Sequence, residues 1–338
     1  MMNGVELALV IALAAAISAA IIMLMLPLLR RYALAHPNAR SSHRKSTPQG
    51  GGIAVIAATI GVAAGAIAAG LNEPTLSSSS LWLVLAAAAF IAVVGVADDL
   101  WTIEVAPRLL LQTLAVVIVI ASLPTELRVV PALPWWVERV LLLLACLWFV
   151  NLTNFMDGID WMTIAEFVPI TIGLALIGWL GALPMSVVVV ALALCGGLIG
   201  FAPFNRPVAR VFLGDVGSLP IGLLFAWQLM LVAGHGHLAA ALVLPLYYLA
   251  DATLTLLRRV MNREPFWQAH RTHFYQLATD RGFSVAGIVA RVFVVNLALV
   301  GLAVGSVLWP GPLGGAIALG CGAAVVGSLL WRFARGKS

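Results

Sequence analysis

Carboxylates stand in short polar segments that interrupt an otherwise apolar chain. Asp98 and Asp99 are adjacent, Asp157 and Asp160 form an Asp-x-x-Asp pair, and Asp215 stands beside a glycine. A carboxylate at the edge of a long apolar run is costly unless it is paired, hydrated or bound to a metal ion. Mg²⁺ takes oxygen ligands from one or two protein groups and completes its shell with water and substrate phosphates. The acids therefore predict a magnesium site that handles phosphate chemistry.

The segment 212–218 (Phe-Leu-Gly-Asp-Val-Gly-Ser) carries Asp215 to the start of an apolar run. Glycine near the acid lets a backbone approach a ligand closely. Free N–H groups at the start of a helix favour phosphate, and Arg206 and Arg210 could add guanidinium forks for an anion. The simpler alternative is that Asp215 only caps the helix.

The segment 151–160 has polar side chains at every third position, namely Asn151, Asn154, Asp157 and Asp160. On a helix this spacing would place them along one stripe. Gly158 is expected to break the helix and to bring backbone close to the site. The alternative is an ordinary amphipathic helix end.

His270, Arg271 and His273 lie in a basic segment between two apolar runs. A His-x-x-His pair can ligate zinc, but no cysteine or third histidine is close in the sequence. A phosphate-binding cluster fits better, and a merely solvated basic loop is the alternative.

An earlier segment joins basic and hydroxyl residues to three glycines at 50–52. This composition suits an anionic ligand such as a phosphate or a lipid headgroup. The candidate residues are Asn38, Arg40, Ser42 and His43.

The composition excludes a soluble, disordered or fibrous protein. Of 338 residues, 62% are hydrophobic and 10% are charged, and the mean hydropathy is +1.05. Soluble domains have about 25% charged residues, whereas one membrane span needs about 20 apolar residues. We predict an all-α, polytopic membrane bundle that forms a single domain over 1–338. The eleven expected spans, with ten as the alternative count, are 7–29, 51–70, 81–97, 108–122, 137–153, 164–180, 185–203, 216–233, 238–257, 285–307 and 313–331.

Lysine and arginine predict the orientation. With the N-terminus outside, in the periplasm, all of the 19 basic residues except Arg128 and Arg139 fall on the cytoplasmic side, as the positive-inside rule requires. The five aspartates above fall on the same side. The net charge of +5 is then explained by basic inner loops rather than by a nucleic-acid partner. The three cysteines, all in apolar runs, are expected to be buried and free of disulfides.

Five motifs, in this order, resemble the polyprenyl-phosphate N-acetylhexosamine-1-phosphate transferases of the glycosyltransferase family 4 type. They are the segments 37–52, 98–99, 154–160, 212–218 and 270–273. The chain is most similar to the transferases that initiate O-antigen, in residues 40–43, 205–210 and 264–273. It departs from the family pattern at 161–163, where Trp-Met-Thr replaces Gly-Leu-Ala. It departs again at Tyr275 and Gln276, where members with a dense histidine cluster have histidine.

The resemblance implies a reaction at the inner face of the bacterial cytoplasmic membrane. Undecaprenyl phosphate would attack the β-phosphorus of a UDP-N-acetylhexosamine, with Mg²⁺ or Mn²⁺ as cofactor and UMP as leaving group. Asp98 or Asp99 would deprotonate or orient the lipid phosphate, and Asp157 and Asp160 would position the nucleotide sugar. The implied metal ligands are Asn154 and Asp215, and the implied substrate-binding residues are Asn38, Arg40, Ser42, His43, Asn151, Arg210, His270, Arg271 and His273.

The alternative functions are a secondary transporter, a CDP-alcohol phosphotransferase and a non-catalytic assembly protein. A secondary transporter also carries acids in its membrane segments, but its site lies near the midplane, often within inverted repeats. A CDP-alcohol phosphotransferase would have one dense motif instead of dispersed ones, and an assembly protein would need no matched acids. The donor sugar, the pathway, a covalent intermediate and a homodimer are left open.

Overall fold

The computed structural model describes residues 3–35, 46–69, 78–265 and 270–336. Helices make up most of this part of the chain, and a two-stranded antiparallel sheet pairs β1 with β2. The helices are α1 (Gly4–Tyr32), α2 (Gly52–Ala68), α3 (Ser78–Trp101), α4 (Val105–Ser122), α5 (Trp135–Met156), α6 (Met162–Trp179), α7 (Met185–Phe201), α8 (Asp215–Gly234), α9 (Leu238–Val243), α10 (Leu246–Met261), α11 (Phe274–Asp280), α12 (Val285–Leu308) and α13 (Pro312–Arg335). The strands are β1 (Leu34–Ala35) and β2 (Thr47–Pro48).

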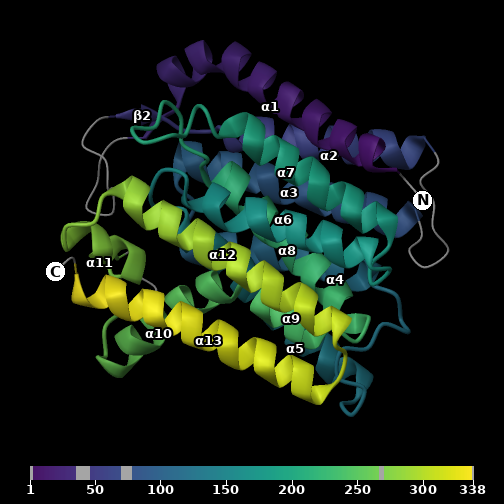
Figure 1. Cartoon of the computed structure of the whole chain (residues 1–338). Helices are drawn as coiled ribbons and strands as arrows, with labels where there is room; N and C mark the ends of the chain where they lie inside the picture. The colour runs from purple at the N-terminus through teal and green to yellow at the C-terminus, as the bar shows by residue number, and fades with distance from the viewer. Residues whose placement is uncertain (1–2, 36–45, 70–77, 266–269, 337–338) are drawn as a thin grey trace.

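The helical membrane bundle predicted from composition is confirmed. Within the described residues, eight helices are long and apolar enough to cross a membrane, namely α1, α3, α4, α5, α6, α8, α12 and α13. The apolar helices α2 and α7 are shorter, with 17 residues each. α1 begins and α13 ends at opposite ends of the bundle (Figure 1). The number eleven and the orientation stay predictions.

The stretch predicted as one span over 238–257 is divided into two helices. α9 ends at Val243 and α10 begins at Leu246, with Pro245 at the start of the second helix. Proline has no N–H to donate to the preceding turn, so the hydrogen-bond ladder cannot continue through it. The break makes α10 a separate amphipathic helix that ends on the side of the polar segments.

The outer helices carry the apolar surface that a bilayer requires. α1 exposes large side chains such as Leu9, Leu24 and Leu28, and only 22% of its most apolar stretch is buried. Exposed apolar patches of this extent are rare on soluble monomers. The exposed residues of α1 therefore face lipid.

The cysteines form no disulfide, as predicted, but one of the three is not buried. All three are free, and Cys146 and Cys195 are buried. Cys321 is exposed, so the prediction that it is buried was wrong. It lies on a face of α13 that turns away from the bundle, and hydropathy does not distinguish an apolar residue facing lipid from one facing protein.

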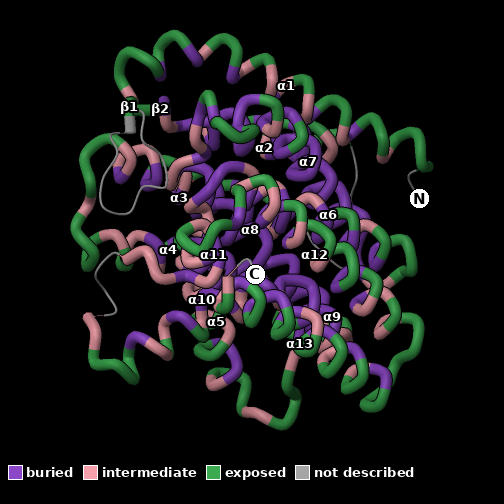
Figure 2. Tube along the Cα trace, turned by 60° about the vertical axis from the view of Figure 1, so that its left-hand side comes forward, coloured by how far each residue is buried: buried purple, intermediate pink, exposed green. Residues whose placement is uncertain are grey.

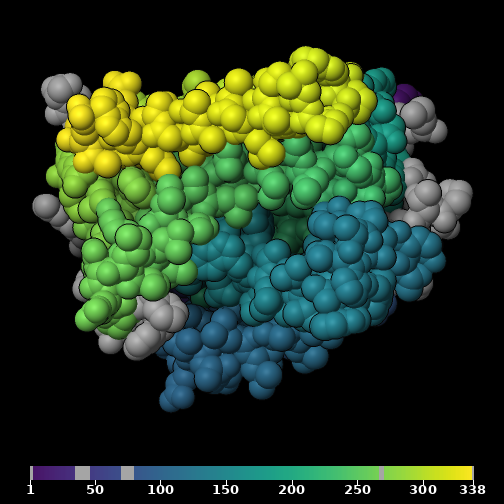
Figure 3. Space-filling model, turned by 90° about the horizontal axis from the view of Figure 1, so that it is seen from below, coloured from purple at the N-terminus to yellow at the C-terminus, as the bar shows by residue number. Residues whose placement is uncertain are grey.

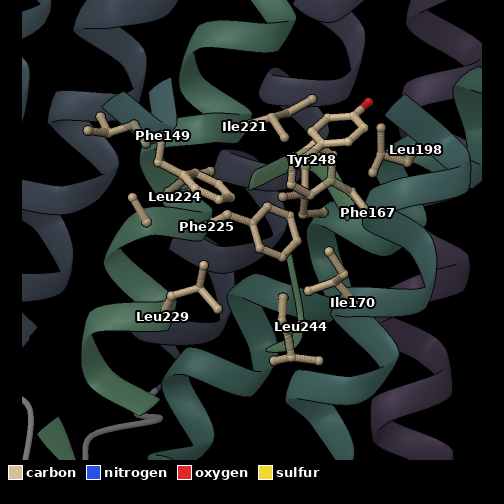
Figure 4. Close-up of a cluster of buried hydrophobic side chains, with 14 of the residues drawn as sticks. Phe149, Phe167, Ile170, Leu198, Ile221, Leu224, Phe225, Leu229, Leu244 and Tyr248 are labelled. Atoms are coloured by element: carbon tan, nitrogen blue, oxygen red, sulfur yellow. The ribbon is translucent and has the colours of Figure 1, made fainter. Parts of the chain in front are cut away.

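α8 is the central helix of the bundle. It is apolar on all sides, the pattern of a fully surrounded helix, and its most apolar stretch is completely buried. It contacts α2, α3, α5 and α9, and Figure 2 shows the buried residues gathered around it. Phe225 of α8 packs against Phe167 of α6, with ring centroids 4.4 Å apart, and Phe167 meets Tyr248 of α10 edge to face (Figure 4).

Glycine lets α3 approach the start of α8 closely. A Cβ atom placed on Gly95 would lie 2.5 Å from the backbone of Asp215, a distance that real Cβ atoms do not tolerate. The last turns of α3, with Asp98 and Asp99, are therefore held against the first turn of α8. Packing thus brings together two acidic motifs that lie more than a hundred residues apart in the sequence.

We predict that Gly95→Ala lowers stability, because the added methyl group would push α3 away from α8. Overpacking of this kind costs about 1–3 kcal/mol. Gly61→Ala is the matched control, since a Cβ there meets nothing within 4 Å. The measurement is thermal unfolding of both purified variants in detergent. Equal unfolding temperatures for the two variants would contradict the close α3–α8 contact.

Candidate functional site

The polar segments meet at one end of the bundle. This end carries the C-terminal ends of α3 and α5, the N-terminal end of α8, strand β2 and helix α11, and it is the left-hand end in Figure 1. Residues 47–52 and 212–213 lie side by side, because the amide of Phe212 donates to the carbonyl of Pro48 (2.8 Å) and the amide of Gly51 donates back to Phe212 (2.8 Å). Two of the motifs recognised in the sequence thus form one surface.

Asp99 caps the N-terminus of α8 from another helix. Its Oδ1 atom accepts a hydrogen bond from the backbone amide of Asp215 (2.9 Å), and its Oδ2 atom accepts one from Val216 (3.2 Å). The Gln49 side chain donates to Oδ1 as well. A carboxylate at this position satisfies amides that have no partner within the helix and faces the positive end of the helix dipole.

Gly214 is required by this cap. Its φ is +78°, a conformation that side chains rarely adopt, and a Cβ atom there would lie 2.5 Å from Asp99 Oδ2. The sequence had predicted that the first amides of this helix would be free for phosphate. That prediction was wrong for Asp215 and Val216, because Asp99 already occupies their N–H groups.

Asp98 and Asp215 bring two carboxyl groups together. Asp98 accepts hydrogen bonds from the Ile103 amide (2.7 Å) and from Arg108 Nη1 (2.9 Å), and its carboxyl group lies within hydrogen-bonding range of that of Asp215. Asn154 Nδ2 donates to Asp215 Oδ1 at 2.7 Å. Two carboxylates at this distance repel each other unless a proton or a cation lies between them.

This pair fits the way in which proteins bind Mg²⁺ with substrate phosphates, through one or two carboxylates plus water. The described residues contain no cluster of three or more His, Cys, Asp or Glu that could hold a metal ion by themselves. Asn154 directs its amide nitrogen at Asp215. It could offer oxygen to a metal ion only after the amide turns over, and the two orientations are close in shape.

The predicted stripe over 151–160 is divided where α5 ends at Met156. Asn151 lies on the helix and bonds Gln112 of α4 (2.9 Å), and Asp160 accepts from the Ala209 amide (3.0 Å). These two side chains therefore hold neighbouring segments. Asp157 follows the helix and is bonded by Thr163.

Burial raises the pKa of Asp157 to about 7, and the nearby carboxylates of Asp99 and Asp160 raise it as well. The Thr163 hydroxyl opposes this shift by donating to the carboxylate. Of the predicted residues, Asp98, Asp99 and Asn154 each contact Asp215. The Asp157 carboxyl group lies close enough to Asp99 for the two charges to interact.

The predicted anion-binding residues differ in their surroundings. Arg210 is exposed, and its guanidinium lies over the ring of Phe204, 5.7 Å from the centroid. Arg271 donates to Thr279 (3.0 Å) and pairs with Asp280 (3.1 Å). The predicted residues Asn38, Arg40, Ser42 and His43 lie outside the described residues.

The histidines of the last polar segment lie next to each other. The rings of His270 and His273 stack with centroids 5.0 Å apart, and His273 is buried with its Nδ1 atom 3.2 Å from Asp251 Oδ1. A carboxylate beside Nδ1 leaves Nε2 as the ring atom that a ligand could meet.

Three further residues of this region had no role predicted from the sequence, namely Gln49, Arg108 and Asp251. Gln49 and Arg108 hold the acids Asp99 and Asp98, which the sequence had singled out. Asp251 is a fully buried carboxylate within a predicted span. A lone acid in such a span was the signal that could have identified it.

We predict that the Asp157 carboxyl group makes stability depend on pH. Its ordinary pKa is 3.8 and the folded value is about 7, so between these values the folded protein keeps a proton that the unfolded chain has lost. Stability therefore falls as the pH rises through this window, by at most about 1.4 kcal/mol per unit, and levels off above pH 7.

Asp157→Asn removes this titration. We expect the free energy of unfolding of the wild type, minus that of Asp157→Asn, to decrease from pH 5 to pH 7 in detergent without divalent ions. Denaturant unfolding at each pH measures it. If this difference in unfolding free energy did not depend on pH, the Asp157 carboxyl group would have the same pKa in the folded and the unfolded protein, and the prediction would be wrong.

Parts of the chain are similar in sequence to known proteins. The family model described as glycosyl transferase family 4 matches residues 81–233, the stretch from α3 to the end of α8. The chain is 26% identical over 292 residues to a Bacillus subtilis protein named "Probable undecaprenyl-phosphate N-acetylglucosaminyl 1-phosphate transferase", covering 81% of this chain and 79% of that one.

Two further relatives share shorter parts. A decaprenyl-phosphate N-acetylglucosaminephosphotransferase of Mycobacterium leprae is 29% identical over 224 residues, which are 61% of this chain and 56% of that protein. A phospho-N-acetylmuramoyl-pentapeptide-transferase of Enterococcus faecalis is 42% identical over 94 residues, 25% of this chain and 29% of that one. Together these matches show that residues 81–233, which hold the acids at the junction of α3, α5 and α8, are similar to glycosyl transferase family 4.

Proposed function

We propose that this protein transfers an N-acetylhexosamine 1-phosphate from a UDP-sugar to undecaprenyl phosphate and releases UMP. The observation that carries this proposal is the carboxyl pair of Asp98 and Asp215, at one end of an apolar bundle. A soluble nucleotide sugar and a membrane-bound phosphate can meet at such an interface. With basic segments on the cytoplasmic side, the site faces the cytoplasm of a bacterial inner membrane.

The relatives' names support the same chemistry. The Bacillus subtilis and Mycobacterium leprae proteins are named for a polyprenyl phosphate and an N-acetylglucosaminyl phosphate, and the Enterococcus faecalis protein for a phospho-N-acetylmuramoyl group. A phosphorylated N-acetylated sugar is common to all three. UDP-N-acetylglucosamine is therefore the first donor to test, and O-antigen initiation is the role that we propose for the lipid product.

The proposed step forms one phosphorus–oxygen bond and breaks another. An oxygen of the lipid phosphate attacks the β-phosphorus of the donor, and the bond between that phosphorus and the bridging oxygen breaks. The bridging oxygen leaves with UMP, and the lipid keeps the sugar phosphate as a diphosphate. Such transfers depend on alignment and on neutralising charge more than on covalent chemistry from the protein.

The chain's residues would align and hold these groups. Asp98, fixed by Arg108, would orient the lipid phosphate, and Asp157 would position the nucleotide sugar. Asp215 and Asn154 would hold Mg²⁺, which when bound neutralises charge that develops on the phosphate oxygens. His270, Arg271 and His273 would contact the diphosphate.

A hollow on one side of the bundle offers room for the lipid acceptor. Seen from the side of α5, α10 and α13, the surface is hollowed between the blue segments of the α4–α5 region and the green segments around α10 (Figure 3). We propose that the isoprenoid chain reaches the site through this hollow. A transporter would place its acids near the midplane, whereas Asp98 and Asp215 lie at helix ends.

We predict that the purified protein releases UMP only when undecaprenyl phosphate, a UDP-N-acetylhexosamine and Mg²⁺ are all present. Asp215→Asn should lower kcat by about a hundredfold or more, because it removes a charge that meets the metal ion and the phosphates. Glu126→Gln is the control. It changes an exposed carboxylate in the segment between α4 and α5 and should keep activity within about twofold.

Three outcomes would count against this proposal. UMP release without added lipid phosphate would indicate hydrolysis instead of transfer. Equal rates for wild type and Asp215→Asn at limiting Mg²⁺ would refute the metal assignment. Absence of any nucleotide binding across a panel of UDP-sugars would exclude the donor class.

A further inference from the structure

Asp251 is a buried carboxylate that holds α11 in place. It has no exposed surface and lies in the middle of α10. Its Oδ1 atom accepts from the Phe274 amide (3.0 Å) and lies 3.2 Å from His273 Nδ1, and its Oδ2 atom accepts from the Tyr275 amide (3.2 Å). Tyr247 and Thr255, one turn away on either side, add hydroxyl donors at 3.4 Å.

This set of donors explains how the carboxylate can be buried. An ionised carboxylate in an apolar interior is costly unless hydrogen bonds replace its hydration. Hydrogen bonds from amides at the start of a helix to a charged acceptor are among the stronger ones in proteins. All of the donors named above come from α10 itself or from residues 273–275, so Asp251 ties the start of α11 to α10.

Tyr275 connects α11 to the acidic turn after α5. Its hydroxyl donates to the backbone carbonyl of Phe155 at 3.1 Å, and the side chain is fully buried. A Cβ atom placed on Gly158 would lie 2.0 Å from this hydroxyl oxygen. The turn that carries Asp157 therefore packs closely against the hydroxyl end of the Tyr275 side chain. Asn154 lies just before this turn in the sequence.

We propose that Asp251 and Tyr275 are positioning residues that set the distance between His273 and the acidic turn at 154–160. Asp251 holds His273 and the start of α11 by hydrogen bonds. Tyr275, in the first turn of α11, contacts the acidic turn, so the position of α11 determines the position of that turn. This inference rests on the proposed transferase function, because it assigns His273 and Asp157 to the same substrate.

The alternative is that these contacts only stabilise the bundle. Glu166 supplies the matched control for that alternative. It is another fully buried carboxylate, but its Oε2 atom accepts from Asn296 of α12 (2.7 Å) instead of from α11. Replacing the carboxyl group of Asp251 or of Glu166 by an amide should have similar effects if burial alone matters, and different effects if α11 must be positioned.

The first experiment compares Asp251→Asn with Glu166→Gln in detergent. The Phe274 and Tyr275 amides donate to different oxygens of Asp251. In asparagine an NH2 group, which only donates, replaces one of these oxygens, so one of the two amides loses its acceptor. We expect faster amide hydrogen exchange in residues 274–280 and 157–163 of Asp251→Asn, with α1 and α7 unchanged. We also expect kcat/KM for the UDP-sugar to fall about tenfold or more while KM for the lipid phosphate stays within about twofold. Glu166→Gln should leave all of these values close to wild type.

The second experiment tests the Tyr275–Gly158 contact by suppression. Gly158→Ala should lower kcat strongly, because its methyl group would collide with the Tyr275 hydroxyl. Tyr275→Phe removes that oxygen, so the double variant Gly158→Ala/Tyr275→Phe should be more active than Gly158→Ala alone. A non-additive pair of this kind indicates a direct interaction that matters for catalysis. A double variant no more active than Gly158→Ala would overturn the contact's role.

The exchange measurement separates failure of this inference from failure of the proposed function. If the wild type shows no turnover with any donor, exchange in 157–163 still reports whether Asp251 positions the turn. If the wild type is active and Asp251→Asn retains its activity and its exchange pattern, the positioning role is wrong. Equal changes in Asp251→Asn and Glu166→Gln throughout the bundle would assign Asp251 a purely structural role.

Discussion

The site depends on the contact between the Asp99 carboxylate and the first amides of α8. This interaction joins the end of α3 to the start of the central helix, with hydrogen bonds of 2.9 Å and 3.2 Å. Asp99 faces the positive end of α8, and the neighbouring residue Asp98 lies beside Asp215. The close approach at Gly95 and the left-handed backbone at Gly214 are the geometric conditions for this arrangement.

The positions of the acids follow from hydrophobic packing of the helices that carry them, and not from interactions among the acids themselves. α8 is apolar on every side, and the surrounding helices bury its most apolar stretch completely. The end that carries Asp215 then defines the depth at which α3 and α5 deliver Asp98 and Asn154. Hydrophobic packing in the interior thus sets distances between polar groups at the surface of the membrane.

Much of this could be predicted from the sequence, because apolar runs mark helices and the acids fall where those runs end. Asp98, Asn154 and Asp215 were predicted to converge, and they do. The partners of Asp99 could not be predicted, because a hydrogen bond between residues 116 positions apart produces no repeating pattern in the sequence. The contact of Tyr275 with Gly158 is hidden for the same reason, and the break at Pro245 was obscured by a continuous hydrophobic stretch.

The most direct test of the central claim is the mass of the lipid product. Purified protein would be incubated with undecaprenyl phosphate, UDP-N-acetylglucosamine and Mg²⁺, and the lipid extracted for mass spectrometry. We predict a lipid that has gained one phosphate together with one N-acetylhexosamine. A lipid that has gained the sugar without a second phosphate would contradict it, because the bond broken would then lie between the sugar and its phosphate.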